Sequence, residues 1–266
     1  MKEFEFYFNA NLPGILSKKK YLAAVNKLVR NIKNEEFKKV VFSRVIEKPI
    51  TKSPDTIFEN LCKAYPSAFV YLITASEFGT WIGATPETFV QIENSTLKTT
   101  ALAGTKTDVS AEWGKKEIEE QVLVSDYIEN VLRKVGCLNI QKTKPFTFNT
   151  GAVYHLKTDF KCLIKEEAVS QLINNLHPTP ATCGLPKQEV MKKLANFETH
   201  NRLLYTGFLG PFSRSKAELY VNLRCMQIIK DKAYLYVGGG ITSDSIAESE
   251  WNETINKSKT LSGFLN

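Results

Sequence analysis

The sequence has few of the residues that most often bind transition metals, with 3 His and 5 Cys among 266 residues. It contains no C-x-x-C and no H-E-x-x-H motif, which argues against a structural zinc site and against zinc hydrolysis. The odd number of scattered cysteines argues against a disulfide framework. No apolar run approaches the roughly 20 residues of a membrane span, and the first residues lack the apolar stretch of a signal peptide. We therefore expect a cytoplasmic protein with no membrane contact.

The sequence also lacks a long tract of basic residues, although its net charge is +7. Lysines occur only in short clusters, and no nucleic-acid-binding motif accompanies them. A nucleic-acid-binding module is consequently the weakest of the alternatives kept here. A basic protein that acts on a small anionic substrate agrees with the same charge.

No repeat, low-complexity segment or flexible linker divides the chain, so we interpret residues 1–266 as a single domain. Hydrophobic periodicity predicts both helices and strands. The predicted helices are 19–33, 54–65, 112–135, 166–175, 187–198 and one from about 246. The predicted strands are 39–44, 69–75, 80–84, 88–93, 96–103, 146–164, 217–229 and 233–241. The short connections between strands require antiparallel hairpins, so the expected fold class is α+β with mostly antiparallel sheets packed with helices.

Two helices place glutamates where apolar residues are expected. On helix 112–135, Glu117 falls inside the apolar stripe and Glu120 lies at its edge, whereas Glu119 points nearly the opposite way. On the C-terminal helix, Glu250 and Glu253 project beside apolar residues. Solvated glutamates at the margin of a wide stripe would give the same pattern. If the two helices face one another, the carboxylates suit a hard cation such as Mg²⁺.

Two further segments indicate a ligand site. The triple glycine at 238–240 follows a predicted strand and precedes S-I-A-E at 245–248, which has the pattern of a helix capping box. Its backbone N–H groups could hold a carboxylate or phosphate, and a plain tight turn is the alternative. The proline-rich segment 177–187 is too rigid for a generic linker and suggests a preset loop at a site.

Taken together, these segments resemble the chorismate-binding enzymes, which include isochorismate synthases, salicylate synthases and the large subunits of anthranilate and aminodeoxychorismate synthases. The matching motifs occur in family order over residues 38–261. They are K-V-V-F-S-R at 39–44, G-A-T-P-E at 83–87, A-L-A-G-T at 101–105, K-E-I-E-E at 116–120, H-P-T-P-A at 177–181, G-L-P-K at 184–187, Y-T-G at 205–207, N-L-R at 222–224, G-G-G-I at 238–241 and E-W-N-E-T at 250–254.

Three features of the sequence distinguish between members of that family, and all three are most similar to isochorismate synthase. Members that use ammonia carry Gln where this chain has Lys39. Aminodeoxychorismate synthases carry a nucleophilic Lys where this chain has Ala103. The H-P-T-P-A loop followed by G-L-P is typical of isochorismate synthases.

The resemblance implies a role for each site residue. Lys39 would be the general base that activates water for attack at C2 of chorismate, and Glu87 the general acid that protonates the departing C4 hydroxyl. Glu120 and Glu253 match the family's direct Mg²⁺ ligands, with Glu117 and Glu250 in support. The remaining matched positions would hold substrate: His177 near the ring, Tyr205 and Arg224 at the enolpyruvyl carboxylate, and Lys257 with the backbone at Gly104 and Gly240 completing the carboxylate contacts. Glu198 and Arg202 flank the Tyr205 loop, and their residue types assign them no role beyond a structural one.

The chain departs from the family in one respect, because relatives carry on the order of 100 more residues before the Lys39 strand. We therefore expect a fold that is shortened at its N-terminus, with exposed sheet edges or edges covered by another subunit. The expected function is a Mg²⁺-dependent isochorismate synthase for menaquinone or siderophore biosynthesis. It would act on chorismate without an amidotransferase subunit, as a monomer or homodimer. A salicylate synthase and a non-catalytic shortened relative are the alternatives.

Overall fold

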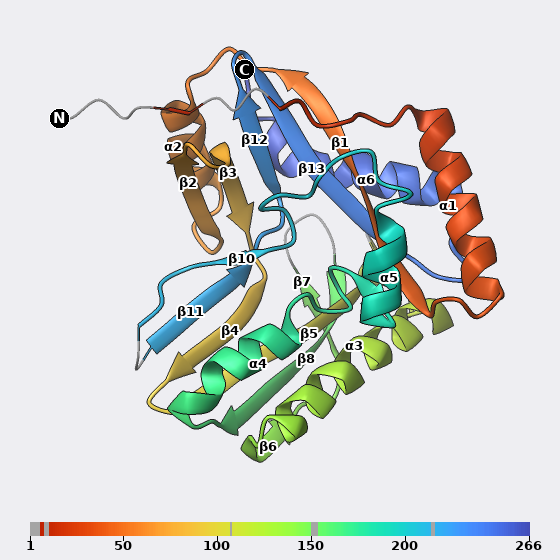
Figure 1. Cartoon of the computed structure of the whole chain (residues 1–266), viewed down its shortest axis with the longest axis vertical. Coiled ribbons are helices and arrows are strands. Elements are labelled where there is room, and N and C mark those ends of the chain that lie inside the picture. Colours follow the sequence, from red (N-terminus) through yellow and green to blue (C-terminus); the bar gives the residue numbers. More distant parts are fainter. Residues whose placement is uncertain (1–5, 8–10, 107, 150–153, 214–215) are drawn as a thin grey trace.

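The computed structural model describes residues 6–7, 11–106, 108–149, 154–213 and 216–266, which form two antiparallel sheets with helices packed against them (Figure 1). Every strand pairing in the described residues is antiparallel, as the short connections predict. The α+β fold class is confirmed. In this described part of the chain, no helix is long and apolar enough to cross a membrane.

The first sheet, sheet A, has the strand order β2-β3-β12-β13-β1-β9. Its strands are β2 (Phe69–Ala75), β3 (Gly79–Thr85), β12 (Cys225–Ile229), β13 (Lys232–Ile241), β1 (Lys39–Pro49) and β9 (Gly184–Leu185). Strand β1 runs the length of β13, from the pair Val40–Ile241 to the pair Pro49–Lys232. At its other edge, β1 meets only the two residues of β9.

The second sheet, sheet B, has the order β10-β11-β4-β5-β8-β6, and β7 also pairs with β8. Its strands are β10 (Phe208–Leu209), β11 (Lys216–Val221), β4 (Thr88–Glu93), β5 (Thr96–Lys106), β8 (Tyr154–Leu163), β6 (Leu138–Lys142) and β7 (Phe146–Asn149). The predicted strand over 146–164 is thus two strands, and residues 150–153 between them lie outside the described residues.

The helices follow the predicted periodicity closely. They are α1 (Lys18–Lys33), α2 (Pro54–Ala64), α3 (Lys115–Lys134), α4 (Val169–Leu176, after a 3-10 turn at Glu166–Ala168), α5 (Lys187–Leu194) and α6 (Ala247–Ser262). Helix α1 shows why they form: Tyr21, Val25, Leu28 and Ile32 recur every three or four residues and are all buried.

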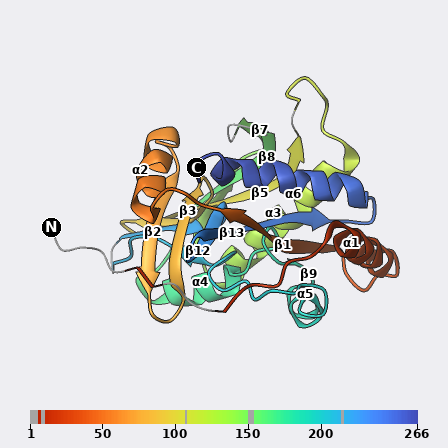
Figure 2. The ribbon, with the colours of Figure 1, turned by 90° about the horizontal axis from the view of Figure 1, so that it is seen from above.

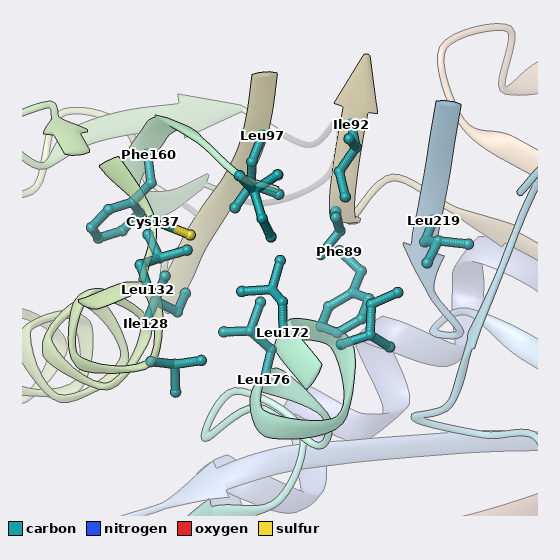
Figure 3. Close-up of a cluster of buried hydrophobic side chains, with 14 of the residues drawn as sticks. Phe89, Ile92, Leu97, Ile128, Leu132, Cys137, Phe160, Leu172, Leu176 and Leu219 are labelled. Carbon is teal, nitrogen blue, oxygen red and sulfur yellow. The ribbon is translucent and has the colours of Figure 1, made fainter. Parts of the chain in front are cut away.

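Each sheet buries one face beneath its own helices. Helices α3 and α4 cover sheet B, and Figure 3 shows Ile128 and Leu132 of α3 and Leu172 and Leu176 of α4 gathered against the strands. Helices α1, α2 and α6 cover sheet A, with α6 lying along β13 and beside α1 (Figure 2). Consequently α3 belongs to one sheet and α6 to the other.

The predicted strand over 217–229 is wrong as a single element. Residues 216–221 pair with β4 in sheet B, whereas residues 225–229 pair with β3 and β13 in sheet A. The break occurs because Arg224 takes a left-handed backbone conformation, with φ of 48°. The chain therefore crosses between the sheets at Arg224.

Candidate active site

A cavity of about 130 Å³ lies where the two sheets approach each other, between the ends of β1, β13 and β5 and the helices α3 and α6. It brings together most of the residues that the sequence singles out. Those lining it are Lys39, Glu87, Gly104, Glu117, Glu120, Tyr205, Arg224, Gly240, Glu253 and Lys257.

Lys39 occupies the first position of β1 and is 1% exposed. Strand alternation turns its side chain toward the cavity, while Val40 and Phe42 pack under α1. Its Nζ lies 2.6 Å from Oε1 of Glu120. A buried ammonium needs such a partner, since an unpaired charge is costly to bury.

Glu87 stands in the short connection between β3 and β4, and it is half-buried in the cavity wall. Burial raises the pKa of its carboxyl from 4.5 to about 7, against the opposing charges of Arg224, Lys257 and Lys39. A general acid needs a shift in this direction, because the carboxyl then keeps its proton near neutral pH. Lys39 and Glu87 thus place an amine and a protonated carboxyl at one cavity.

The glutamates on α3 lie as the helical geometry predicts. Glu117 and Glu120 line the cavity, whereas Glu119 is 61% exposed and faces Lys115. The same holds on α6, where Glu253 lines the cavity and Glu248 is 56% exposed.

Glu250 of α6 lies behind the cavity lining, buried at 2% exposure. The predicted capping box is absent: α6 starts after Ile246, and Ser245 Oγ donates to Glu250 Oε1 at 2.6 Å. The same hydroxyl accepts the Thr242 N–H at 3.1 Å. Ser245 therefore fixes the Glu250 carboxylate instead of capping the helix.

The glycines of β13 make room for these carboxylates. A Cβ at Gly239 would stand 3.1 Å from Glu250 Oε2 and 3.6 Å from Glu253 Oε1. A Cβ at Gly240 would stand 2.8 Å from Glu120 Oε1. Oxygens from both helices thus converge on the backbone of two adjacent glycines, and a set of carboxylate oxygens without His or Cys suits a hard cation.

The carboxylates are held by lysines in this arrangement. Lys39 forms an ion pair with Glu120, and Lys257 forms one with Glu253, with its Nζ 2.5 Å from Oε1. Across the described ranges, no three acidic, histidine or cysteine side chains stand close enough to hold a metal ion as they are. The donor set fits Mg²⁺ in chemistry, and in this structure Glu120 and Glu253 are each paired with a lysine.

A second group of side chains supplies positive charge and a hydroxyl. Arg224 Nη1 donates to the Lys257 carbonyl at 3.5 Å, and Lys257 Nζ donates to the Gly238 carbonyl at 3.0 Å. Burial lowers the pKa of Arg224 and raises that of Tyr205. The Tyr205 hydroxyl lies close over Gly238, where a Cβ would stand 2.9 Å from it. Two cations and a hydroxyl at one wall can bind a carboxylate.

The cavity is lined by His155, whereas the predicted substrate contact His177 lies outside the lining. His177 is not among the lining residues: its Nε2 contacts the Thr206 carbonyl at 3.0 Å, and its ring packs edge-on against Phe89 and Phe208. His155, which the sequence reasoning did not select, lines the cavity from β8. Burial lowers its pKa to about 4, so the ring is neutral and Nδ1 donates to the Gly104 carbonyl at 2.8 Å. Its Nε2 is then an acceptor.

The family model described as "Chorismate binding enzyme" matches residues 9–266. The chain belongs to the chorismate-binding enzyme family. A vibriobactin-specific isochorismate synthase from Vibrio cholerae is 27% identical over 95% of this chain and 68% of its own. An anthranilate synthase component 1 from Lactococcus lactis is 25% identical over 94% of this chain and 58% of its own.

The fold of this chorismate-binding enzyme is that of solved relatives. The structure of MenF, the menaquinone-specific isochorismate synthase from Escherichia coli, superposes with a TM-score of 0.84, covering 100% of this chain and 65% of MenF at 21% identity. At that identity the match shows the fold alone. The chain spans 58–68% of the length of these three proteins.

Proposed function

We propose that this chain is an isochorismate synthase, which isomerises chorismate by adding water at C2 and removing the C4 hydroxyl. The proposal rests on one observation: Lys39 and Glu87 line the same cavity. They bring an amine together with a carboxyl whose pKa is raised to about 7. The name of the Vibrio relative supports the same reaction at 27% identity.

The reaction needs one proton removed and one supplied. In this step Lys39 acts as the neutral amine and takes a proton from the water that attacks C2. The ring double bonds shift, and the C4 hydroxyl leaves as water with the proton of Glu87. A neutral carboxyl in a half-buried wall can give up that proton at pH 7, whereas an ordinary glutamate would already be ionised.

The substrate's two carboxylates account for the positive side chains. We assign Arg224 and Tyr205 to the enolpyruvyl carboxylate, and Lys257 with the backbone of Gly104 and Gly240 to the remaining carboxylate contacts. His155 adds a neutral ring nitrogen at the same cavity, while His177 supports the wall from behind. The net charge of +7 favours approach of such a dianion.

Magnesium is the cofactor that the acidic residues fit. Glu120 and Glu253 would hold the ion, with Glu117 and Glu250 in support; when bound, it would bind and orient the C1 carboxylate of chorismate. Lys39 and Lys257 hold these carboxylates in the structure described here, so both must give way when the metal binds.

Two lining residues favour isochorismate synthase over its relatives. A lysine at position 39, in place of the glutamine of ammonia-using enzymes, favours water as the nucleophile, and we expect no amidotransferase subunit. Ala103 lines the cavity and cannot form the covalent adduct of an aminodeoxychorismate synthase. We propose menaquinone or siderophore biosynthesis as the pathway, and we expect a monomer or homodimer.

The product decides the proposal. We expect purified protein given chorismate and Mg²⁺ without ammonia to form an equilibrium mixture of chorismate and isochorismate, and EDTA to stop it. Lys39→Ala should lose at least about 100-fold in turnover, whereas Lys38→Ala, an exposed neighbour, should not. Salicylate with pyruvate would identify a salicylate synthase. Absence of metal-dependent turnover would identify a non-catalytic relative, and either result overturns the proposal.

A further inference from the structure

The outer edge of β1 is incomplete beside the cavity. Strand β9 pairs with Lys39 and Val40, and the Cys183 carbonyl takes the Val41 N–H at 2.8 Å. No strand continues beyond this point in the described residues, so the Val41 carbonyl and the Ser43 N–H face out of the sheet. Both groups are buried and need partners.

An arginine–glutamate pair supplies those partners. Arg202 Nη2 donates to the Val41 carbonyl at 2.6 Å, and Glu198 Oε1 accepts the Ser43 N–H at 2.8 Å and the Ser43 hydroxyl at 2.6 Å. The guanidinium and carboxylate are themselves joined by two bonds, from Nη2 at 2.7 Å and from Nε at 2.9 Å. The pair therefore continues the sheet as a further strand would.

Arg202 also reaches two other segments. Its Nη1 donates to the Thr182 carbonyl at 2.8 Å and lies 3.5 Å from Thr206 Oγ1, while its own carbonyl accepts the Tyr205 N–H at 2.8 Å. Thr206 has a φ of 63°, a conformation that a non-glycine residue holds only when its surroundings fix it.

The three segments tied to Arg202 are walls of the candidate active site. Val41, Thr182, Tyr205 and Thr206 all line the cavity, whereas Arg202 and Glu198 do not. The side chains of the pair are 17% and 5% exposed. A buried ion pair is by itself weak evidence for stability, so its geometry, which joins three walls of one cavity, is the informative feature.

We propose that Arg202, oriented by Glu198, is a positioning residue that fixes the substrate-binding walls of the cavity without touching the substrate. This inference rests on the proposed function. A planar guanidinium with five donors can bind Glu198, Val41 and Thr182 together, and a lysine ammonium cannot span all three. The pairing of Lys39 with Glu120 does not involve Arg202, so the loss of Arg202 affects the binding of chorismate more than the chemical step.

The test compares KM and kcat in matched variants. Arg202→Lys keeps the charge, and we expect kcat/KM for chorismate to fall on the order of 100-fold, mainly through a higher KM, because misplaced walls hold the substrate poorly. Arg133→Lys is the control: Arg133 forms an ion pair with Glu129 at the same i,i+4 spacing, but it is 65% exposed on α3 and away from the cavity. That variant should keep both constants.

The outcome separates positioning from mere stability. A structural role would lower the melting temperature and the active fraction but leave KM as in the wild type, and an unchanged KM overturns the proposal. If Arg202→Lys does not fold, Glu198→Gln is measured instead; it keeps an oxygen for Ser43 and loses the charge pair, so KM should rise several-fold.

Measurements on the wild-type chain distinguish failure of the proposed function from failure of the positioning role. If that chain forms no isochorismate, calorimetric titration with chorismate replaces kinetics. Weaker binding by Arg202→Lys than by wild type then supports the positioning role. Equal binding overturns it, and absence of binding by the wild type overturns both proposals.

Discussion

Glu87, the proposed general acid, shows at the scale of one residue how burial shifts the pKa of a carboxyl. Its pKa of about 7 keeps the carboxyl protonated below neutrality, and deprotonation above pH 7 removes the acid. Taken alone, this ionisation lowers kcat/KM about tenfold per pH unit above that value, since kcat/KM reports ionisations of the free enzyme. Glu87→Gln should lose about 100-fold or more in turnover at every pH, and Glu77→Gln, an exposed control, should behave as wild type. A Glu87 carboxyl that titrates near its ordinary value of 4.5 in the folded protein, followed by NMR, would contradict the assignment.

The same shift makes a prediction about stability. A carboxyl whose pKa is raised on folding stabilises the folded state fully below its unfolded pKa of 4.5, and this contribution disappears as pH rises through about 7. Glu87→Gln cannot ionise, so denaturant unfolding should find it about equal to wild type at pH 4 and more stable at pH 8, by up to about 3 kcal/mol. Equal stability at both pH values would show that Glu87 titrates normally.

How far the sequence predicts the site depends on the residue. Helical spacing alone separates Glu120 from Glu119, because a helix fixes the direction of each side chain. His155 escapes such reasoning, since its contact with the Gly104 carbonyl depends on the register of β8 against β5, in which Ala103 faces Leu156. Alternation along 154–163 buries Leu156 and Thr158 and places His155 on the opposite face of the strand, so it carried no signal for the cavity. The role of His177 as a wall residue likewise depends on its contact with Thr206, far along the chain.

At the scale of elements, the three glycines of β13 that precede Ile241 leave room for the carboxylates of α3 and α6. Gly240 lies between Glu120 and Lys39, and a Cβ there would stand 2.8 Å from the carboxylate oxygen and 3.1 Å from Lys39 Cε. Gly240 is not among the residues with positive φ, so a residue with a side chain can adopt its backbone conformation. Gly240→Ala should therefore fold normally and lose at least about tenfold in kcat/KM by displacing Lys39, the proposed general base. Gly263→Ala, with open space around its Cβ, is the control for kinetics and melting temperature. Wild-type kinetics in Gly240→Ala would show that the close contact has no consequence.

Element boundaries were the less predictable part of the fold. The run 217–229 is continuously strand-like in composition, and only the backbone of Arg224 divides it. That division brings Arg224 to the junction of the two sheets, which is where the cavity lies. Local propensity cannot report such a break, because it results from contacts with both sheets.

At the scale of the whole molecule, the carboxylates come from two separate halves. Helix α3 packs on sheet B and α6 on sheet A, so an ion held by Glu120 and Glu253 would join the two sheets. Binding to the folded state alone must then stabilise the entire fold. At 100 times the dissociation constant the gain is about 2.7 kcal/mol, which corresponds to a rise in melting temperature of roughly 5–10 °C for a chain of this size.

Thermal melts in Mg²⁺ and in EDTA measure this rise without reference to activity. Glu120→Gln and Glu253→Gln should each remove most of it, because each deletes one oxygen donor and one charge. Glu119→Gln and Glu248→Gln are matched controls, since they lie on the exposed faces of the same two helices and should melt with the wild-type rise. A rise that survives in all four variants would place the ion elsewhere. A rise lost only in the cavity-lining pair would place the ion between α3 and α6, so that its binding energy stabilises the fold at the junction of the two sheets.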